Sequence, residues 1–289
     1  MFWFKRKQKD KPIIHKKARL GLALGGGGAR GVGHIGVLKA FNELGIDFEF
    51  VSGTSVGAII GSLYSAGFTP DELEKITKTL KVSDIKKRNL FFMPTSTEKL
   101  EETLLKIYNK DIVFSELDKP FTAVCVNLKD GSEVKVNSGS VIKAVCASSA
   151  VPGVFKPVVY RGMHLVDGGL INNVPADVVR EMGANVVIAI DVNPTRGKGT
   201  ESLKLTSILS STVGVMMQKN IETKLAYADL VIIPELGEFS SSKFSDVDLM
   251  IKRGYDAVMD KKEEILALLK RGPKLKKIVW HLKSKRRKS

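Results

Sequence analysis

Residues 48–64 read FEFVSGTSVGAIIGSLY, and the pentapeptide Gly-Thr-Ser-Val-Gly occupies positions 53–57. The residues before it, 48–51, form an apolar extended run, and those after it, 58–64, have the composition of a buried helix. We therefore expect a strand, a tight turn and a helix, with Ser55 at the apex of the turn. Glycines on both sides allow a strained turn, and the helix N-terminus provides a positive field at the serine hydroxyl. This context predicts a nucleophile elbow.

A second glycine-rich segment follows another apolar run. Residues 20–24, Leu-Gly-Leu-Ala-Leu, indicate a buried strand that leads into GGGGARG at residues 25–31. A helix is expected from about Gly33 to Leu44. Consecutive glycines leave backbone N–H groups uncovered by side chains, so these groups can converge on an anion at a helix N-terminus. The segment is suited to an oxyanion hole or to a phosphate cradle.

The phosphate alternative has a motif of its own. Residues 26–31 satisfy the dinucleotide fingerprint G-x-G-x-x-G, and Asp47 and Glu49 lie near the offset expected for an acid that binds a ribose. However, the second strand runs directly into the turn at Ser55, so both loops are expected at the same carboxyl edge of the sheet. This favours the oxyanion hole, with a dinucleotide-binding protein as the alternative.

Arg30 lies at the start of the helix that follows the glycines. A cation there opposes the helix dipole. A carboxylate partner or a negatively charged group of the substrate would compensate for this charge, and a solvated arginine without a role is the alternative.

A serine hydroxyl is a poor nucleophile unless a general base lies within hydrogen-bonding distance. Two of the four histidines, His15 and His281, lie in charged terminal segments. His34 lies early in the first expected helix, which leaves His164 as the histidine candidate. Asp167 begins the turn Asp-Gly-Gly, and an aspartate can act as the base directly where partial burial raises its basicity. Asp167 is the preferred base and His164 the alternative.

The serine turn, the glycine loop and the aspartate turn occur in an order that resembles the patatin-like phospholipase family. Members of that family use a Ser-Asp dyad with a glycine-rich oxyanion loop. The resemblance extends from Leu20 to Val192. The matching blocks are GGGGARG at 25–31, GTSVG at 53–57, ASSAVPGVF at 147–155, DGG at 167–169 and NNVP at 172–175.

The resemblance implies a role for each motif residue. Ser55 is then the nucleophile and Asp167 the proton acceptor. The backbone N–H groups of Gly26, Gly27 and Gly28 would form the oxyanion hole. We find no convincing metal-ligand cluster in the sequence, and no cofactor is expected. The remaining motif positions are Arg30, Gly31, Gly53, Gly57, Gly168 and Gly169.

The whole chain predicts one large α/β domain. Strand-like runs alternate with helical stretches, which favours a mainly parallel sheet covered by helices on both faces. The capping boxes Thr69–Glu72 and Thr95–Glu98 mark two helix starts, and residues 247–269 have the periodicity of one long helix. Residues 81–94 contain an apolar cluster that indicates a lid, an acyl-chain wall or simple core packing. The strand-like runs are 20–24, 48–51, 121–127, 186–190 and 230–233.

Cys125 and Cys146 are the only cysteines, and their apolar surroundings indicate buried free thiols rather than a disulfide. No apolar segment is long enough to span a bilayer, and the N-terminus carries charges where a signal peptide would be apolar. We therefore expect a cytoplasmic protein, peripheral at the membrane if its termini bind lipid.

The net charge of +15 is concentrated at the two ends of the chain. Residues 1–19 hold eight Lys and Arg and one Asp, and residues 274–289 hold eight Lys and Arg and no acid, whereas residues 20–273 are neutral overall. The chain thus divides into a basic N-terminal tail, one patatin-like domain and a basic amphipathic C-terminal tail. Aromatic anchors such as Trp3 and Trp280 favour an anionic membrane surface. Nucleic-acid binding and solvated tails are the alternatives.

These features predict a serine acyl hydrolase that cleaves lipid acyl esters, of phospholipase A, lysophospholipase or esterase type, through an acyl-enzyme. The expected partners are an acyl-ester substrate and an anionic membrane, rather than nucleic acid. A catalytically silent lipid-binding module with the same fold is one alternative, and the dinucleotide-binding protein is another. An intact Ser55, Asp167 and glycine loop favour the enzyme.

Overall fold

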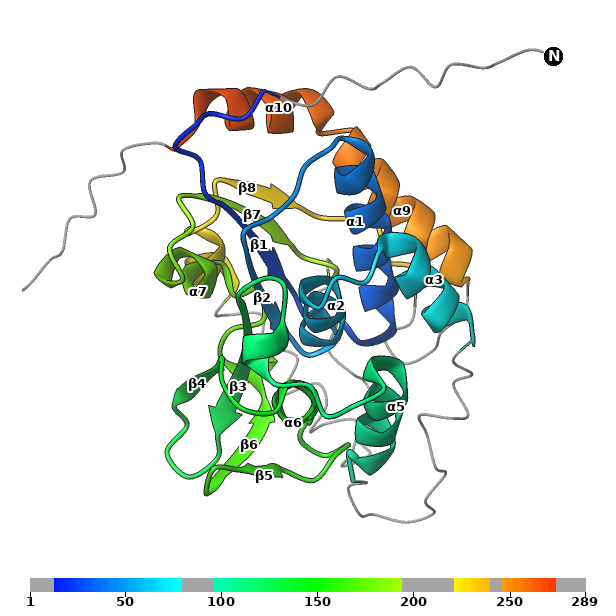
Figure 1. Cartoon of the computed structure of the whole chain (residues 1–289), viewed down its shortest axis with the longest axis vertical. Helices are drawn as coiled ribbons and strands as arrows, with labels where there is room; N and C mark the ends of the chain where they lie inside the picture. The colour runs from blue at the N-terminus through cyan, green and yellow to red at the C-terminus, as the bar shows by residue number, and fades with distance from the viewer. Residues whose placement is uncertain (1–12, 80–95, 194–220, 240–245, 274–289) are drawn as a thin grey trace, which may run out of the picture.

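Figure 1 shows a central sheet with helices packed against it. The computed structural model describes residues 13–79, 96–193, 221–239 and 246–273. Within these ranges eight strands form one sheet, in the order β5-β6-β3-β2-β1-β7-β8, and β4 also pairs with β3. The expected α/β fold is confirmed.

Five strands pair in parallel and form the larger part of the sheet. They are rich in buried apolar residues, as is typical of parallel strands covered on both faces. The strand-like runs in the sequence match them, with two differences. Strand β2 begins two residues later and continues directly to the serine turn, and β8 ends one residue earlier, at Ile232. The five are β1 (Leu20–Leu24), β2 (Phe50–Thr54), β3 (Phe121–Asn127), β7 (Val186–Ile190) and β8 (Leu230–Ile232).

Three short strands extend the sheet with antiparallel pairing, which the alternation of strands and helices does not predict. Two hairpins account for them. The turn between β3 and β4 contains Gly131, and the turn between β5 and β6 contains Arg161 and Gly162, all with positive φ. Such backbone angles are typical of tight hairpin turns. The strands are β4 (Glu133–Val136), β5 (Val158–Tyr160) and β6 (Met163–Asp167).

Strands β2 and β6 meet end to end along one edge of β3. Val124 of β3 pairs with Thr54 of β2 and with Lys135 of β4, which must therefore lie on opposite edges. The next residue, Cys125, pairs with Asp167 of β6 and again with β4. Because β4 occupies the same edge throughout, β2 and β6 share the other one. The last residues of these two strands, Thr54 and Asp167, are thereby brought together.

Helices cover both faces of the sheet, as predicted. Leu22 and Leu24 of β1 join a large core shared with α1 and α2, whereas Ala23 joins a smaller core that includes Val179 of α7. The described helices of six or more residues are α1 (Gly33–Glu43), α2 (Val56–Ser65), α3 (Pro70–Thr79), α5 (Glu98–Tyr108), α6 (Val141–Ser148), α7 (Ala176–Glu181), α9 (Val247–Met259) and α10 (Lys262–Arg271).

The capping box at Thr69–Glu72 is present at the start of α3. The Thr69 N–H donates to Glu72 Oε2 at 2.8 Å, and the Glu72 N–H donates to Thr69 Oγ1 at 3.3 Å. Each group satisfies a backbone donor that the first turn of the helix leaves unpaired. Thr95 of the second predicted box lies outside the described residues.

The single helix expected over residues 247–269 is in fact two helices, α9 and α10. Lys261 leaves the helical region, with φ −100° and ψ 12°, and the chain changes direction there (Figure 1). Ile265 and Leu269 of α10 still reach the large core. Apolar periodicity does not reveal the break because both helices bury an apolar face.

Residues 13–19 belong to the folded body rather than to the basic tail. The His15 N–H donates to the Leu269 carbonyl oxygen at 2.9 Å, and the Arg19 N–H donates to Asn185 Oδ1 at 2.7 Å. The N-terminal tail is therefore shorter than the sequence predicts. Its remaining residues 1–12, the candidate lid at 81–94 and the C-terminal tail at 274–289 lie outside the described residues.

Candidate active site

Ser55 has a strained backbone conformation at the junction of β2 and α2. Its φ is 56° and its ψ is −126°, a region that residues other than glycine rarely adopt. The turn places the serine at the N-terminus of a helix, where the helix dipole favours negative charge. The expected strand, turn and helix are therefore all present, and the serine at the apex is half-buried.

Packing requires both glycines of the pentapeptide. A Cβ on Gly53 would lie 2.3 Å from the carbonyl oxygen of Gly57. A Cβ on Gly57 would lie 2.1 Å from the carbonyl oxygen of Leu24. Both obstacles are backbone atoms held in the sheet and the turn. The G-x-S-x-G pattern thus reflects how closely the serine turn approaches the end of β1.

Asp167 ends β6 and is buried, with 2% of its surface exposed. Its Oδ1 accepts the backbone N–H of Gly169 at 2.8 Å, whereas Oδ2 accepts no hydrogen bond of ordinary geometry from the described residues. Burial raises the pKa of Asp167 to about 6, partly opposed by the Gly169 N–H and by the Ser55 hydroxyl. A carboxylate with this pKa is suited to accept a proton near neutral pH.

Ser55 and Asp167 lie close together because β2 and β6 end at the same point on β3. Thr54, the residue before Ser55, pairs with Val124 of β3, and Asp167 pairs with the next residue, Cys125. The Ser55 hydroxyl is close enough to lower the pKa of Asp167, although it makes no ordinary hydrogen bond to Oδ2. Long or poorly aligned contacts are common in ligand-free sites and shorten when substrate binds.

His164, the alternative base, is exposed on β6. It lies three residues before Asp167, and side chains alternate along a strand, so the two point to opposite faces. The position of His164 therefore does not favour it as the base.

His34 has a supporting position instead. It is fully buried, and its Nε2 lies 2.8 Å from the Gly25 carbonyl oxygen, which can only accept, so Nε2 carries the proton. Burial lowers the pKa of His34 to about 4, which keeps the ring neutral at physiological pH. Of the remaining histidines, His15 lies beside α10, away from the site, and His281 lies outside the described residues.

The glycine loop, residues 25–28, joins β1 to a short 3-10 helix, η1 (Gly28–Val32). The N–H of Gly26 donates to the Asn173 carbonyl oxygen at 3.0 Å. Gly26 therefore departs from the expectation that it supplies an oxyanion donor, because its N–H is used within the protein. The N–H groups of Gly27 and Gly28 have no acceptor among the described residues. They are the donors of this loop that are free to bind an anion.

Arg30 is half-buried just after the glycine loop. Its Nε donates to the Phe239 carbonyl oxygen at 2.8 Å, and its Nη1 donates to Asn193 Oδ1 at 2.5 Å. Burial lowers the pKa of Arg30. A carbonyl and an amide oxygen thus contact the charge for which the sequence suggested a carboxylate, a substrate anion or solvent.

The glycines after Arg30 and Asp167 also allow close packing. A Cβ on Gly31 would lie 2.2 Å from Val56 Cγ2, beside the serine turn. A Cβ on Gly168, the first residue of the 3-10 helix η3 (Gly168–Leu170), would lie 2.3 Å from the Val124 carbonyl oxygen.

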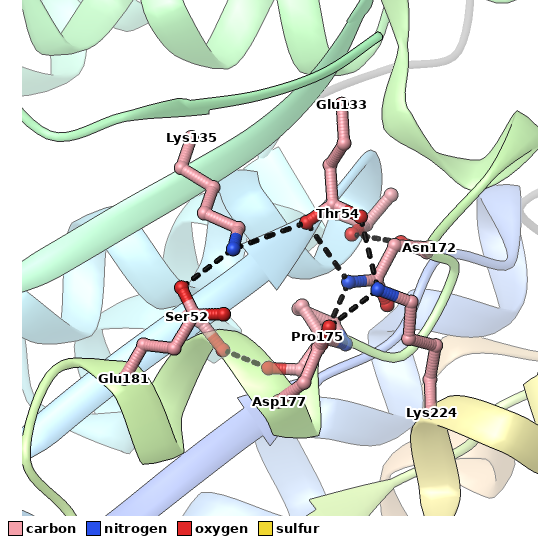
Figure 2. A network of polar contacts seen from close by, with 9 residues as sticks. All are labelled: Ser52, Thr54, Glu133, Lys135, Asn172, Pro175, Asp177, Glu181 and Lys224. Atoms are coloured by element: carbon pink, nitrogen blue, oxygen red, sulfur yellow. Dashed lines mark hydrogen bonds and ion pairs between the residues drawn. The ribbon is translucent and has the colours of Figure 1, made fainter. Parts of the chain in front are cut away.

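The block at residues 172–175 connects the loop after Asp167 to β2 (Figure 2). Thr54 Oγ1 donates to the Asn172 carbonyl oxygen at 2.8 Å. Asn172 Nδ2 donates to Asp177 Oδ1 at 2.8 Å, and Asp177 forms an ion pair with Lys224. The family resemblance includes this block but implies no role for it. Its polar groups hold the aspartate loop against the strand that carries the serine.

Comparison with known proteins places this site in a family. The sequence profile of the patatin-like phospholipases matches residues 22–180, more than half of the chain. The chain belongs to the patatin-like phospholipase family. The matched range includes the glycine loop, Ser55 and Asp167.

Two relatives illustrate how much of the patatin-like sequence is shared. Patatin-like phospholipase domain-containing protein 6 of Homo sapiens is 33% identical over 232 residues, which cover 77% of this chain and 16% of that protein. An uncharacterised NTE family protein of Mycobacterium tuberculosis is 34% identical over 183 residues, which cover 61% of this chain and 49% of that protein. This patatin-like chain therefore spans less than half the length of these relatives.

Two solved structures share the patatin-like fold. VipD from Legionella pneumophila has a TM-score of 0.61 and 15% identity, over 88% of this chain and 70% of that one. Human GIVD cytosolic phospholipase A2, in complex with methyl gamma-linolenyl fluorophosphonate, has a TM-score of 0.51 and 13% identity, over 88% of this chain and 58% of that one. At these identities the likeness concerns the fold alone.

The dinucleotide-binding alternative is wrong for this patatin-like chain. Asp47 and Glu49 precede β2, at the opposite end of the strand from the glycine loop. Asp47 forms an ion pair with Lys119 at 2.8 Å, and Glu49 forms one with Arg19 at 2.7 Å. Both acids therefore form surface ion pairs at the end of the sheet opposite the glycine loop.

The two cysteines, Cys125 and Cys146, are buried and unpaired, as expected. Within the described ranges, no group of three or more His, Cys, Asp or Glu side chains is arranged to hold a metal ion. No helix in the part of the chain that the structure describes is long and apolar enough to cross a membrane.

Proposed function

We propose that this chain is a serine acyl hydrolase that cleaves lipid acyl esters through an acyl-enzyme. One observation carries the proposal: the strained Ser55, at a helix N-terminus, lies beside a buried Asp167 whose pKa burial raises to about 6. Membership of a family named for phospholipases supports a lipid substrate. The fluorophosphonate in the complex of the human phospholipase is a reagent for activated serines, which suggests the probe for this site.

The proposed reaction has two halves, formation of the acyl-enzyme and its hydrolysis. In the first, Asp167 accepts the proton of the Ser55 hydroxyl while Oγ attacks the ester carbonyl carbon. The N–H groups of Gly27 and Gly28 and the N-terminus of α2 stabilise the charge on the carbonyl oxygen, and Asp167 returns the proton to the leaving alcohol. In the second half, Asp167 takes a proton from water, whose oxygen attacks the acyl carbon. The bond from that carbon to Ser55 Oγ then breaks, Asp167 returns the proton to Oγ, and the fatty acid is released.

We further propose that the basic tails bring the enzyme to an anionic membrane from the cytoplasm, as a peripheral protein. The tails join the folded body at neighbouring points, because the His15 N–H donates to the Leu269 carbonyl oxygen and a Cβ on Gly272 would lie 2.5 Å from His15 Cγ. Two basic segments attached side by side can engage one surface together, so that the second binds at high effective concentration.

Fluorophosphonate labelling, with the modified peptide identified by mass, tests the catalytic proposal. The wild type should be labelled at Ser55, Ser55→Ala should not be labelled, and both Ser55→Ala and Asp167→Asn should lose hydrolysis of a short-chain nitrophenyl ester. Because the two residues act as one unit, the double variant should be no worse than either single one. Vesicle binding without labelling or hydrolysis would indicate the silent lipid-binding module. Activity retained in Asp167→Asn but lost in His164→Ala would assign the base to His164.

A further inference from the structure

The peptide group between Gly26 and Gly27 has little of its own to fix its orientation. Glycine residues adopt a wide range of backbone angles, so a peptide between two glycines can rotate with a low steric cost. Its orientation matters because the carbonyl oxygen lies on one edge of the planar group and the N–H on the opposite edge. Only the N–H can stabilise an oxyanion, so some neighbour must select between the two.

Asn173 makes two hydrogen bonds to Gly26. Its backbone carbonyl oxygen accepts the Gly26 N–H at 3.0 Å, and its side-chain Nδ2 donates to the Gly26 carbonyl oxygen at 3.2 Å. A carbonyl oxygen can only accept, so the amide atom that contacts it must be the NH2 group. This assigns which atom of the side-chain amide is the nitrogen. Gly26 also lies close to both residues, because a Cβ on Gly26 would lie 2.6 Å from Asn173 Oδ1 and 3.1 Å from Ser55 Cβ.

Planarity of the peptide carries this contact to the next residue. In a trans peptide the C=O and the following N–H point in opposite directions. Since Asn173 binds the Gly26 carbonyl oxygen, the N–H of Gly27 points away from Asn173. It has no acceptor among the described residues. A hydrogen bond to the carbonyl also polarises the peptide and strengthens its N–H as a donor.

Asn173 is itself held in place. It is buried, with 2% of its surface exposed, and its neighbour Asn172 is tied to Thr54 on one side and to Asp177 on the other (Figure 2). Lys224 completes the network through Asp177. Asn172 and Asn173 therefore connect the glycine loop to Thr54, the residue before Ser55.

We infer that Asn173 is a positioning residue that orients the Gly26–Gly27 peptide so that the Gly27 N–H faces the reacting carbonyl oxygen. The inference rests on the proposed function, because it assigns a reason for one donor of the proposed oxyanion hole. Without the Asn173 amide, the peptide would lose its selected orientation and present a carbonyl oxygen to the developing negative charge.

The test compares Asn173→Ala and Asn173→Asp with a matched control, Asn185→Ala. Asn185 holds the other end of β1 in a similar way, with its Oδ1 accepting the Arg19 N–H at 2.7 Å and its Nδ2 donating to the Lys17 carbonyl oxygen at 2.8 Å. Both Asn173 variants should lower kcat for a nitrophenyl ester by about 100-fold, the loss typical of one oxyanion donor. KM should stay within about threefold, since ground-state binding is not touched.

Two further readouts separate positioning from general support. A trifluoromethyl ketone forms an oxyanion on Ser55, so its affinity should fall by the same factor as kcat, while the pH dependence of kcat/KM for Asn173→Ala should be unchanged. Asn173→Asp keeps the side-chain shape and serves if the alanine variant does not fold. Asn185→Ala should lower stability without a selective loss of kcat or of ketone affinity.

The inference is overturned if folded Asn173 variants keep wild-type kcat and ketone affinity, or if Asn185→Ala changes both to the same extent. These outcomes differ from a failure of the proposed function, in which the wild type itself would not hydrolyse the ester. In that case the amide NMR signal of Gly27 still decides the orientation. A Gly27 signal unaffected by Asn173→Asp would refute the inference, and an altered one would support it.

Discussion

The backbone N–H of Ser55 donates a hydrogen bond to the hydroxyl of Ser148, with an N–O distance of 3.0 Å. The same hydroxyl donates to the carbonyl oxygen of Val124 at 2.6 Å. Ser148 ends α6, so its hydroxyl joins the strained serine turn to β3. A residue other than glycine with a positive φ persists only where its surroundings hold it there. This relay is one of the contacts that hold it.

Replacing Ser148 with Ala should therefore lower both stability and the reactivity of Ser55. The change leaves the Ser55 N–H and the Val124 carbonyl without this partner, which costs about 1–3 kcal/mol in buried sites. Chemical denaturation and the rate of fluorophosphonate labelling measure the two effects. Ser65→Ala is the matched control, because the Ser65 hydroxyl is buried in α2 and has no partner among the described residues. Similar losses in both variants would contradict a specific role for Ser148.

Activity should depend on pH through Asp167. Its pKa is raised to about 6, and only the ionised form can accept the serine proton. The value of kcat/KM should be highest above this pKa and fall by about tenfold for each pH unit below it. His164 is the alternative base, so the profile of His164→Ala is the control and should match the wild type. Loss of the acidic limb in His164→Ala would show that His164 is the titrating group.

Asp167→Asn should stabilise the protein at neutral pH while removing its activity. Folding raises the pKa of this carboxyl group from 3.8 to about 6, so the ionised group opposes folding above the folded-state pKa. Below the unfolded-state pKa both states are protonated and the penalty disappears. The variant should thus gain about 2–3 kcal/mol in the free energy of unfolding at neutral pH and lose this gain as pH falls through the window between the two pKa values. Denaturation across that window measures the gain, and a less stable variant at neutral pH would contradict the burial argument.

Thr54→Val should weaken the connection between β2 and the aspartate loop. Thr54 is buried, and its hydroxyl donates to the Asn172 carbonyl oxygen at 2.8 Å. Valine keeps the shape but leaves that oxygen without this donor, at a cost of about 1–3 kcal/mol in stability. Thr122→Val on the adjacent strand is the control, since its buried hydroxyl has no partner among the described residues. We expect Thr122→Val to be neutral or stabilising, with full activity. If both variants behaved alike, the bond to Asn172 would have no measurable role.

The sequence predicted those features that a few neighbouring residues determine. The serine turn is one, because the close approaches of Gly53 and Gly57 involve backbone within or next to the turn. The parallel strands are another, because each is a separate apolar run. The break at Lys261 was missed, since it interrupts the backbone without interrupting the apolar pattern.

Features that depend on distant residues could not be predicted in this way. The meeting of Thr54 and Asp167 depends on how β2 and β6 share one edge of β3, and no local pattern encodes that pairing. The glycine run indicated uncovered N–H groups but not that Asn173 already binds the one on Gly26. Ser148 lies in the block 147–155, but no local pattern shows that its hydroxyl accepts the Ser55 N–H.

The last prediction concerns the basic tails and uses the corrected boundary of the fold. Deleting residues 1–12 and 274–289 removes thirteen of the 46 Lys and Arg residues but keeps residues 13–19, which contact α10 and β7 through His15 and Arg19. At about 1 kcal/mol for each basic residue near an anionic surface, this loss should abolish sedimentation with phosphatidylglycerol vesicles. Hydrolysis of bilayer lipid should slow, whereas hydrolysis of a soluble nitrophenyl ester should stay nearly unchanged.

Single deletions and salt make the test specific. Because the two tails start from neighbouring points beside His15 and Gly272, each single deletion should weaken vesicle binding by much more than half, as expected when two linked segments bind one surface. Raising the salt from about 0.1 M to 1 M shortens the screening length from about 10 Å to 3 Å and should release the intact protein as well. A doubly truncated protein that still binds the vesicles would place the membrane surface on the folded body instead. An intact protein that prefers DNA to vesicles at matched salt would assign the tails to nucleic acid.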